Sequence, residues 1–316
     1  MTYFNKNEFT SFLLKGQLHD AIAYLSNFSD KKDCLEMYTN VFQHGQYYKR
    51  SENETIGNID RIYQEYYRDV FWNKLSNEEA MKQLFYKLWL FCGSNDALTI
   101  DENIEDEIAK IVIAEGYEYL GGSTQGYFGP YIWKKSERVT YEVELPSGIE
   151  AYTIIMMDGF ISRSWLDFIS FGLIGAGGWV GDKGTLCCVR SSYENGSEEF
   201  FNISFLKHEA QHAYDKKKYS NITSVDLEYR AKLVELIYWP DSRKIKEIFR
   251  ESDASNPDNS HSIAADRIIH SMMDRLFRGE SVNDESSWND KVDQIQLYAL
   301  ELLKESSRML DEYAEE

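Results

Sequence analysis

Two of the six histidines in this 316-residue chain lie four residues apart in the segment FLKHEAQHAYD, residues 205–215. On a helix, His208 and His212 project one turn apart from the same face, so both imidazoles can bind one metal ion. Glu209 follows the first histidine and is angled away from that ion, where its carboxylate can take a proton from a zinc-bound water. The pattern indicates metal-assisted hydrolysis. The alternative is two histidines that share a helix face by chance.

The element expected to carry these residues is a helix that begins at Asn202. Asn202 is a favourable N-cap, and no proline or glycine follows it before Tyr219. Leu206, Ala210 and Ala213 fall on one stripe that can face the core. The two histidines then lie together on the adjacent stripe.

A catalytic zinc site needs a third protein ligand besides the two histidines. A second helix is expected over residues 223–239, and Pro240 stops it. Glu228 lies in the first turns of this helix, beside its apolar stripe, and can point inward when the two helices pack together. We therefore expect Glu228 to bind Zn²⁺ together with His208 and His212.

Three other carboxylates compete for the role of third ligand. Glu235 lies two turns further from the connection, and Asp226 is near the helix start, where it can serve as a cap. Asp215 shares the histidine stripe, but its Cα is about 10.5 Å along the helix axis from that of the first histidine. The structural alternative for Glu228 itself is an ion pair with Lys232, one turn on.

Metal-assisted hydrolysis of a carbonyl group also needs a donor for the negative charge that develops on the carbonyl oxygen. We place His270 in this catalytic role, with Asp266 one turn earlier to orient it. His261, Tyr214 and Tyr219 remain open as alternatives.

The remainder of the chain indicates an α+β fold. Apolar residues recur with helical spacing from Asn7 to about Gly93, including two helices that meet near Gly16, and a short helix is expected near residues 104–115. Between them lies the polar, acidic stretch 93–107, which predicts a boundary. We expect an N-terminal all-helical region over residues 1–95 and a second domain over residues 96–316.

The second domain is expected to contain a small antiparallel sheet followed by helices. Residues 127–157 hold aromatic and β-branched runs on either side of Pro146-Ser147-Gly148, which indicates two strands joined by a turn. A further strand is expected at residues 185–190. Strands followed by helices favour an α+β domain over an alternating parallel sheet.

The segment His208-Glu209-Ala210-Gln211-His212, followed by Glu228, resembles the zincin metallopeptidases, specifically their gluzincin branch. The match covers residues 208–228, with a plausible helical remainder and preceding sheet. It implies a zincin-like fold, His208, His212 and Glu228 as zinc ligands, and Glu209 as general base. It further implies that residues 177–189 include an edge strand that pairs with extended substrate, its glycines permitting close approach. The alternative there is an ordinary loop and core strand.

The sequence differs from the motifs of two related zincin branches. Residues 215 and 218 are Asp215 and Lys218, where the metzincins would have glycine and histidine, and this excludes that branch. Thermolysin-like gluzincins have an aspartate four residues after the glutamate ligand, whereas this chain has Lys232. We expect Asp215 or Asp226 to supply the carboxylate that orients an imidazole instead.

Composition narrows the class of partner. The chain has 53 acidic and 34 basic residues, a formal net charge of -19, which opposes binding to nucleic acid and to anionic membranes. No secretory signal is evident, the longest uncharged run, residues 168–181, is too short to span a bilayer, and the four cysteines form no C-x-x-C pair. We expect a cytoplasmic protein with a peptide or protein substrate. Its oligomeric state stays open.

The resulting hypothesis is a zinc-dependent metallopeptidase. Two alternatives remain: a non-catalytic binding or regulatory protein that keeps the fold as a scaffold, and a zinc hydrolase of a non-peptide substrate.

Overall fold

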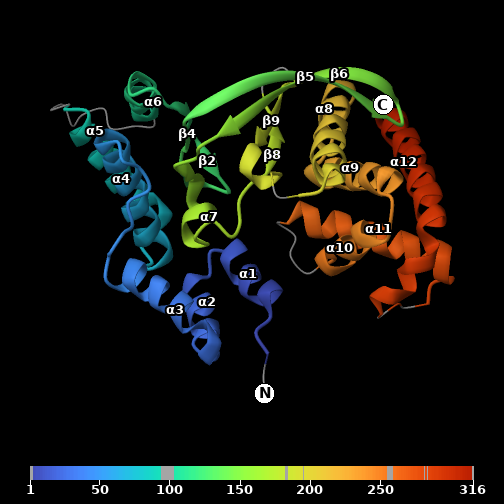
Figure 1. Cartoon of the computed structure of the whole chain (residues 1–316), viewed down its shortest axis with the longest axis horizontal. Coiled ribbons are helices and arrows are strands. Elements are labelled where there is room, and N and C mark those ends of the chain that lie inside the picture. Colours follow the sequence, from blue (N-terminus) through green and yellow to red (C-terminus); the bar gives the residue numbers. More distant parts are fainter. Residues whose placement is uncertain are drawn as a thin grey trace. The chain divides into compact units, whose positions relative to one another are not determined.

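The computed structural model describes residues 3–93, 103–181, 184–194, 196–254, 259–280, 282 and 284–314. The chain is mixed α+β, as expected, and divides into two compact units whose elements are labelled in Figure 1. One unit comprises Met1–Ser136 and Met157–Ala176, and the other comprises Glu137–Met156 and Gly177–Glu316. The predicted domain boundary between residues 95 and 96 lies outside the described residues.

The first unit begins with helices, as the sequence indicates. They are α1 (Lys6–Leu14), α2 (Leu18–Leu25), α3 (Lys32–Tyr38), α4 (Glu54–Phe71), α5 (Asn77–Phe91) and α6 (Ile104–Ala114), with short turns η1 (Ser29–Lys31) and η2 (Thr39–Gln43). Gly16 joins the first two with φ +66°, and a Cβ there would lie 2.8 Å from the ring of Phe71. Glycine is therefore required at this turn.

Short strands complete this unit. They are β1 (Glu118–Leu120), β4 (Tyr131–Trp133) and β7 (Ser162–Arg163) in the order β1-β4-β7, the pair β2 (Ser123–Thr124) and β3 (Tyr127–Phe128), and then helix α7 (Ser164–Ile169). Buried Arg50 ties α4 to α7 by pairing with Asp60 and with Asp167, the latter at 3.2 Å. These strands were not predicted one by one, because runs of two or three residues carry no measurable alternation.

The second unit is built on a four-stranded sheet with the order β5-β6-β9-β8. Its strands are β5 (Lys135–Leu145), β6 (Gly148–Asp158), β8 (Gly178–Val180) and β9 (Leu186–Val189). The predicted hairpin turn at Pro146-Ser147 and the predicted strand at residues 185–190 are both confirmed. Tyr152, Ile154 and Met156 alternate toward the core, which fixes the face of the sheet that the helices cover.

Strand β8 lies at one edge of this sheet and pairs with β9 in antiparallel register, Trp179 opposite Cys187. A Cβ on Gly178 would lie 2.4 Å from the ring of Phe205, and one on Gly177 would lie 2.7 Å from the hydroxyl of Tyr193. These two glycines therefore make room for aromatic rings of the chain itself. Their small size is explained without an approaching peptide backbone.

The helices of the second unit follow the sheet. The π-helical segment η6 (Phe200–Lys207) leads directly into α8 (His208–Lys218), and α9 (Ser224–Tyr238), α10 (Arg243–Glu251), α11 (Ser260–Phe277) and α12 (Val292–Ala314) complete the set, with short turns η5 (Arg190–Ser192) and η7 (Glu285–Lys291). In Figure 1, α8 to α12 gather on one side of the sheet. Their apolar faces and the sheet share one core. None of the described helices combines the length and apolarity needed to cross a membrane.

The predicted start at Asn202 of the helix that carries the two histidines is wrong. The predicted start of α9 near residue 223 is confirmed. Helical turns begin at residue 198, directly after Ser197, so Asn202 lies inside the helix and not at its N-cap. The backbone N–H of Phe200 donates to the carbonyl of Ser197 at 2.9 Å, so the helical turns start before Asn202. In α9 the Thr223 hydroxyl accepts a hydrogen bond from the backbone N–H of Asp226 at 3.1 Å, and the helix ends before Pro240.

Candidate metal centre

Helices α8 and α9 bring together the three predicted ligands. The Nε2 atom of His212 lies 3.4 Å from one carboxylate oxygen of Glu228, and Nε2 of His208 lies 3.6 Å from the other. The two imidazole rings are edge to face, with centroids 4.6 Å apart. One donor atom from each of the three residues lies within 4.8 Å of the other two. The arrangement requires that His208 and His212 share one face of α8, as their spacing predicts.

These spacings match the edges of a metal coordination shell. Tetrahedral ligands about 2.0–2.1 Å from zinc are about 3.3–3.4 Å from one another. The 3.4 and 3.6 Å separations between nitrogen and oxygen are close to that value and are longer than good hydrogen bonds. Two imidazoles and one carboxylate are also the donor set that suits zinc. The residues present therefore fit a zinc ion.

Glu235 fixes the ring of His208 from the side opposite to Glu228. Nδ1 of His208 lies 2.8 Å from Oε1 of Glu235, a carboxylate that is itself buried. If Nδ1 carries the proton and donates it to Glu235, the lone pair of Nε2 points toward Glu228. The contact with Glu235 thus fixes the orientation of this imidazole ring.

The carboxylate of Glu235 is held in turn by two further groups. Ser204 donates a hydrogen bond to its second oxygen at 2.6 Å, and the buried ammonium of Lys244 lies 2.9 Å from the same oxygen. Burial disfavours a charged carboxylate, but His208 and Lys244 outweigh it and hold the pKa of Glu235 well below its ordinary value. The group therefore stays ionised.

Charge at the three-ligand cluster favours a cation. Burial opposes the imidazolium form of His208, yet the carboxylates of Glu228 and Glu235 raise its pKa to about 10. Burial likewise opposes ionisation of Glu228, but the three histidines His208, His212 and His261 lower its pKa far below the usual value. The site stabilises positive charge between these groups, whether a proton or a metal ion supplies it.

Glu209 lies beside the cluster without a partner. It is 9% exposed, and no hydrogen bond or ion pair to its carboxylate is found in the described part of the chain. Its negative charge is also felt by Cys188 on β9. Burial raises the pKa of the Cys188 thiol to about 12, and Glu209 adds a smaller contribution in the same direction. That thiol is protonated at neutral pH. The unpaired carboxylate is the group available to accept a proton.

His261, and not His270, comes to the cluster. Nδ1 of His261 lies 2.9 Å from Glu228, and its side chain is 52% exposed. His270 lies nine residues later on α11, about two and a half turns of helix, and so faces the opposite side. Its Nδ1 lies near the carbonyl and carboxylate of Asp266 on its own helix, and its side chain is 71% exposed. The predicted pairing with Asp266 is present, but the catalytic placement of His270 is not supported.

The other carboxylates weighed as ligands have structural partners. Asp215 is fully buried and forms a two-point ion pair with Arg230 at 2.8 and 2.9 Å. Asp226 accepts hydrogen bonds from Thr223 and Arg267. Among the described residues, neither carboxylate forms a hydrogen bond or ion pair with an imidazole, and the carboxylate that orients His208 is Glu235 instead.

Lys232 pairs with Glu251 at 2.6 Å and not with Glu228. The structural alternative for Glu228, an ion pair one turn along its own helix, is therefore absent.

Two buried atoms of the cluster lack a hydrogen-bond partner among the residues that the structure describes. They are Nδ1 of His212 and one carboxylate oxygen of Glu228. The ring of His212 is positioned mainly by its contact with His208 and by the helix itself.

With this geometry established, the chain was compared with models of protein families, with curated proteins and with solved structures. None of the three comparisons gives a match. A function for this chain is therefore inferred from the residues and geometry of the site itself.

The residue that sequence reasoning missed is Glu235. It was considered only as a ligand and set aside, yet it lies seven residues after Glu228, which places both on one face of α9. That spacing was the available signal. Lys244 on α10 gave no signal, because its contact with Glu235 depends on how two helices pack.

Proposed function

We propose that this protein is a zinc-dependent metallopeptidase with a zincin-like fold in its second unit. The observation that carries the proposal is the convergence of His208, His212 and Glu228 beside the unpaired carboxylate of Glu209. The three residues supply the donor set of a catalytic zinc site. The fourth residue supplies the base that such hydrolysis needs.

When bound, zinc would polarise a substrate carbonyl and make an attacking water more acidic. His208, His212 and Glu228 would hold it. Glu209 accepts the proton of the attacking water and returns it to the leaving amine. Its low exposure strengthens this role, because a carboxylate shielded from bulk water interacts more strongly with the reacting groups.

His261 is the candidate donor to the developing oxyanion. It reaches the cluster from α11, a third helix, and stays half exposed, so its ring can turn toward a substrate in the open part of the site. In the observed position its Nδ1 lies 2.9 Å from a carboxylate oxygen of Glu228. His261 therefore replaces His270 in the proposal.

The edge strand β8 supports a peptide as substrate over other carbonyl compounds. It precedes the helix that carries the ligands, and one side of it is not paired with another described strand. An extended peptide can add to such an edge through main-chain hydrogen bonds. The short length of β8, three residues, sets how much of the peptide it can hold.

The first experiment measures zinc per chain by elemental mass spectrometry, for wild type, His212→Ala and Glu209→Gln. The proposal expects about one zinc in wild type and in Glu209→Gln, and little in His212→Ala. Peptide-library cleavage is then measured with the same three proteins. Cleavage should appear only in wild type.

The measurement separates the alternatives. Negligible zinc in all three proteins would refute the metal site. Equal cleavage by wild type and Glu209→Gln would refute the role of the base. Zinc without cleavage of any peptide would favour a non-catalytic binding protein, or a hydrolase of another substrate.

A further inference from the structure

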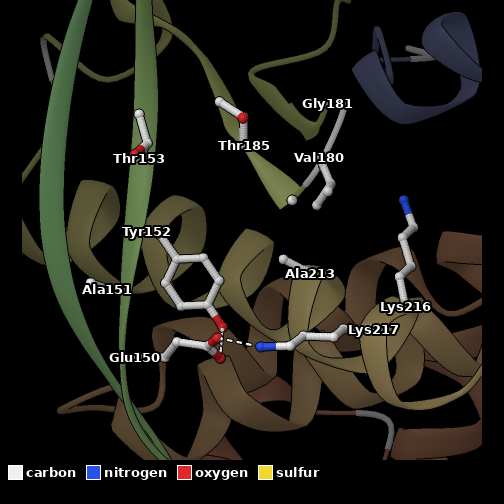
Figure 2. Close-up of a pocket in the computed structure, with 11 residues that line it drawn as sticks. Glu150, Ala151, Tyr152, Thr153, Val180, Gly181, Thr185, Ala213, Lys216 and Lys217 are labelled. Atoms are coloured by element: carbon white, nitrogen blue, oxygen red, sulfur yellow. Dashed lines mark hydrogen bonds and ion pairs between the residues drawn. The ribbon is translucent and has the colours of Figure 1, made fainter.

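A pocket of about 540 Å³ lies beside the helix that carries the proposed zinc ligands. Strand β6 forms one wall with residues 150–153, and the end of β8 contributes Val180 and Gly181. Helix α8 forms the wall opposite with Ala213, Lys216 and Lys217, as Figure 2 shows. Every one of these residues belongs to the second unit.

This pocket continues the face of α8 on which Glu209 lies. Residues four and seven positions apart fall on the same side of a helix, so Glu209, Ala213 and Lys216 form one stripe. Along the helix axis, the Cα of Lys216 is about 10.5 Å from that of Glu209. The pocket is therefore positioned as a neighbour of the reacting centre, at the carboxyl end of α8.

The two lysines of the pocket differ in their partners. Lys217 lies 2.7 Å from Glu150, whose other oxygen accepts a hydrogen bond from the Tyr152 hydroxyl at 3.1 Å. Lys216 is exposed and has no hydrogen bond or ion pair with any residue in the described ranges. In Figure 2 its side chain rises from α8 on the side of Val180, whereas Lys217 extends toward Glu150.

We propose that this pocket binds one acidic side chain of the peptide substrate, with Lys216 as the residue that pairs with its carboxylate. The inference rests on the proposed peptidase function and deepens it by naming a substrate preference. Thr185, which precedes β9 and also lines the pocket, carries a hydroxyl that can donate to a carboxylate as well. Glu150 is neutralised by Lys217, so the unpaired charge among the described residues that line the pocket is positive.

The preference concerns a single acidic residue and not an acidic peptide. The net charge of -19 repels anions at long range, but screening limits that field to about 8 Å at physiological salt. A contact with Lys216 acts well within that distance. An extended chain advances about 3.3 Å per residue, so the 10.5 Å offset places the preferred acid about three residues from the cleaved bond.

The test measures binding in the absence of hydrolysis. The full-length, zinc-loaded Glu209→Gln protein is titrated with fluorescein-labelled peptide pools about eight residues long, random over uncharged residues, in which one position at a time is Glu, Gln or Lys. Fluorescence anisotropy gives the affinity of each pool. The same titrations are made after adding Lys216→Gln, Lys216→Glu or Lys304→Gln. Lys304 is the matched control, an exposed lysine of α12 without a recorded partner in the described ranges.

At one position, we expect the Glu pool to bind about fivefold tighter than the Gln pool, the size of an exposed ion pair. The difference should vanish with Lys216→Gln, shift toward the Lys pool with Lys216→Glu, and persist with Lys304→Gln. The inference is overturned if the Glu and Gln pools bind with equal affinity at every position. It is likewise overturned if neither pool binds. It is also overturned if the difference survives Lys216→Gln.

Cleavage by the wild-type protein separates this inference from the function on which it rests. Hydrolysis without any acidic preference would remove the role of Lys216 and leave the peptidase proposal intact. Binding that depends on Lys216, without hydrolysis of the same peptides, would remove the peptidase proposal and leave the pocket as an acid-binding site.

Discussion

Glu235 and His208 form a buried pair in which the imidazole Nδ1 lies 2.8 Å from the carboxylate, while Nε2 of the same ring faces Glu228. A ligand histidine is effective when its second nitrogen is fixed in this way. In the proposed zinc site, the pair connects the affinity for the metal to Glu235, which is not one of the proposed ligands.

Glu235→Gln should weaken zinc binding by about 10- to 100-fold, because His208 loses the charged acceptor that orients its ring. Competition with a chromogenic zinc chelator measures the affinity. Glu247→Gln is the matched control, since Glu247 also pairs with Lys244 but is recorded in no contact with an imidazole. Equal affinity of Glu235→Gln and wild type would contradict the positioning role.

Removal of zinc should lower thermal stability without abolishing the fold. The metal stabilises the native state by about 2.7 kcal/mol at a free concentration a hundred times its dissociation constant. The apolar core shared by the sheet and helices is independent of the ligands and remains. Thermal unfolding followed by circular dichroism, with and without chelator, gives the shift in midpoint. His212→Ala should show almost none, and an equal shift in that variant would point to metal bound elsewhere.

His261→Gln should reduce kcat/KM by about 100-fold while zinc per chain stays unchanged, because the oxyanion donor is lost and the three ligands remain. His270→Gln is the internal control on the opposite face of α11, and its kcat/KM should equal that of wild type. The reverse result, with activity sensitive to His270 and indifferent to His261, would reinstate the sequence-based assignment.

Arg230→Met should destabilise the protein by about 3–5 kcal/mol, because it leaves the fully buried carboxylate of Asp215 without its partner. Urea unfolding measures the loss. The double variant Asp215→Asn with Arg230→Met should recover part of it, since the uncompensated charge is then gone. A double variant no more stable than the single one would mean that the contacts of Arg230 with Ser306 and Ser307 dominate.

The central part of the site could be predicted because it is local. His208, Glu209 and His212 need only a helix to acquire their arrangement, and Glu228 needs only the next helix to pack back. The hairpin around Pro146-Ser147 was predictable for the same reason, since a turn and two alternating strands are visible in one stretch of sequence.

The parts that were missed or misplaced depend on packing between elements. His261 and His270 are equally plausible on α11 until the face that meets Glu228 is known. Glu235 was set aside as a ligand because it lies two turns further along α9 than Glu228. Its contact with His208 is made across the packed faces of α8 and α9, which the sequence does not show. Asn202 was misplaced because it lies inside the π-helical segment η6, which begins at Phe200 and continues into α8.

All four residues that set the centre, His208, His212, Glu228 and Glu235, come from two consecutive helices joined by a short connection. Contacts so close along the chain cost little loop-closure entropy, and local contacts form early in folding. A chain emerging from the ribosome would therefore hold the complete set of proposed zinc ligands before α11 and α12 are made. Zinc present during synthesis would then act on the order of folding, holding the α8–α9 pair together until the later helices cover it.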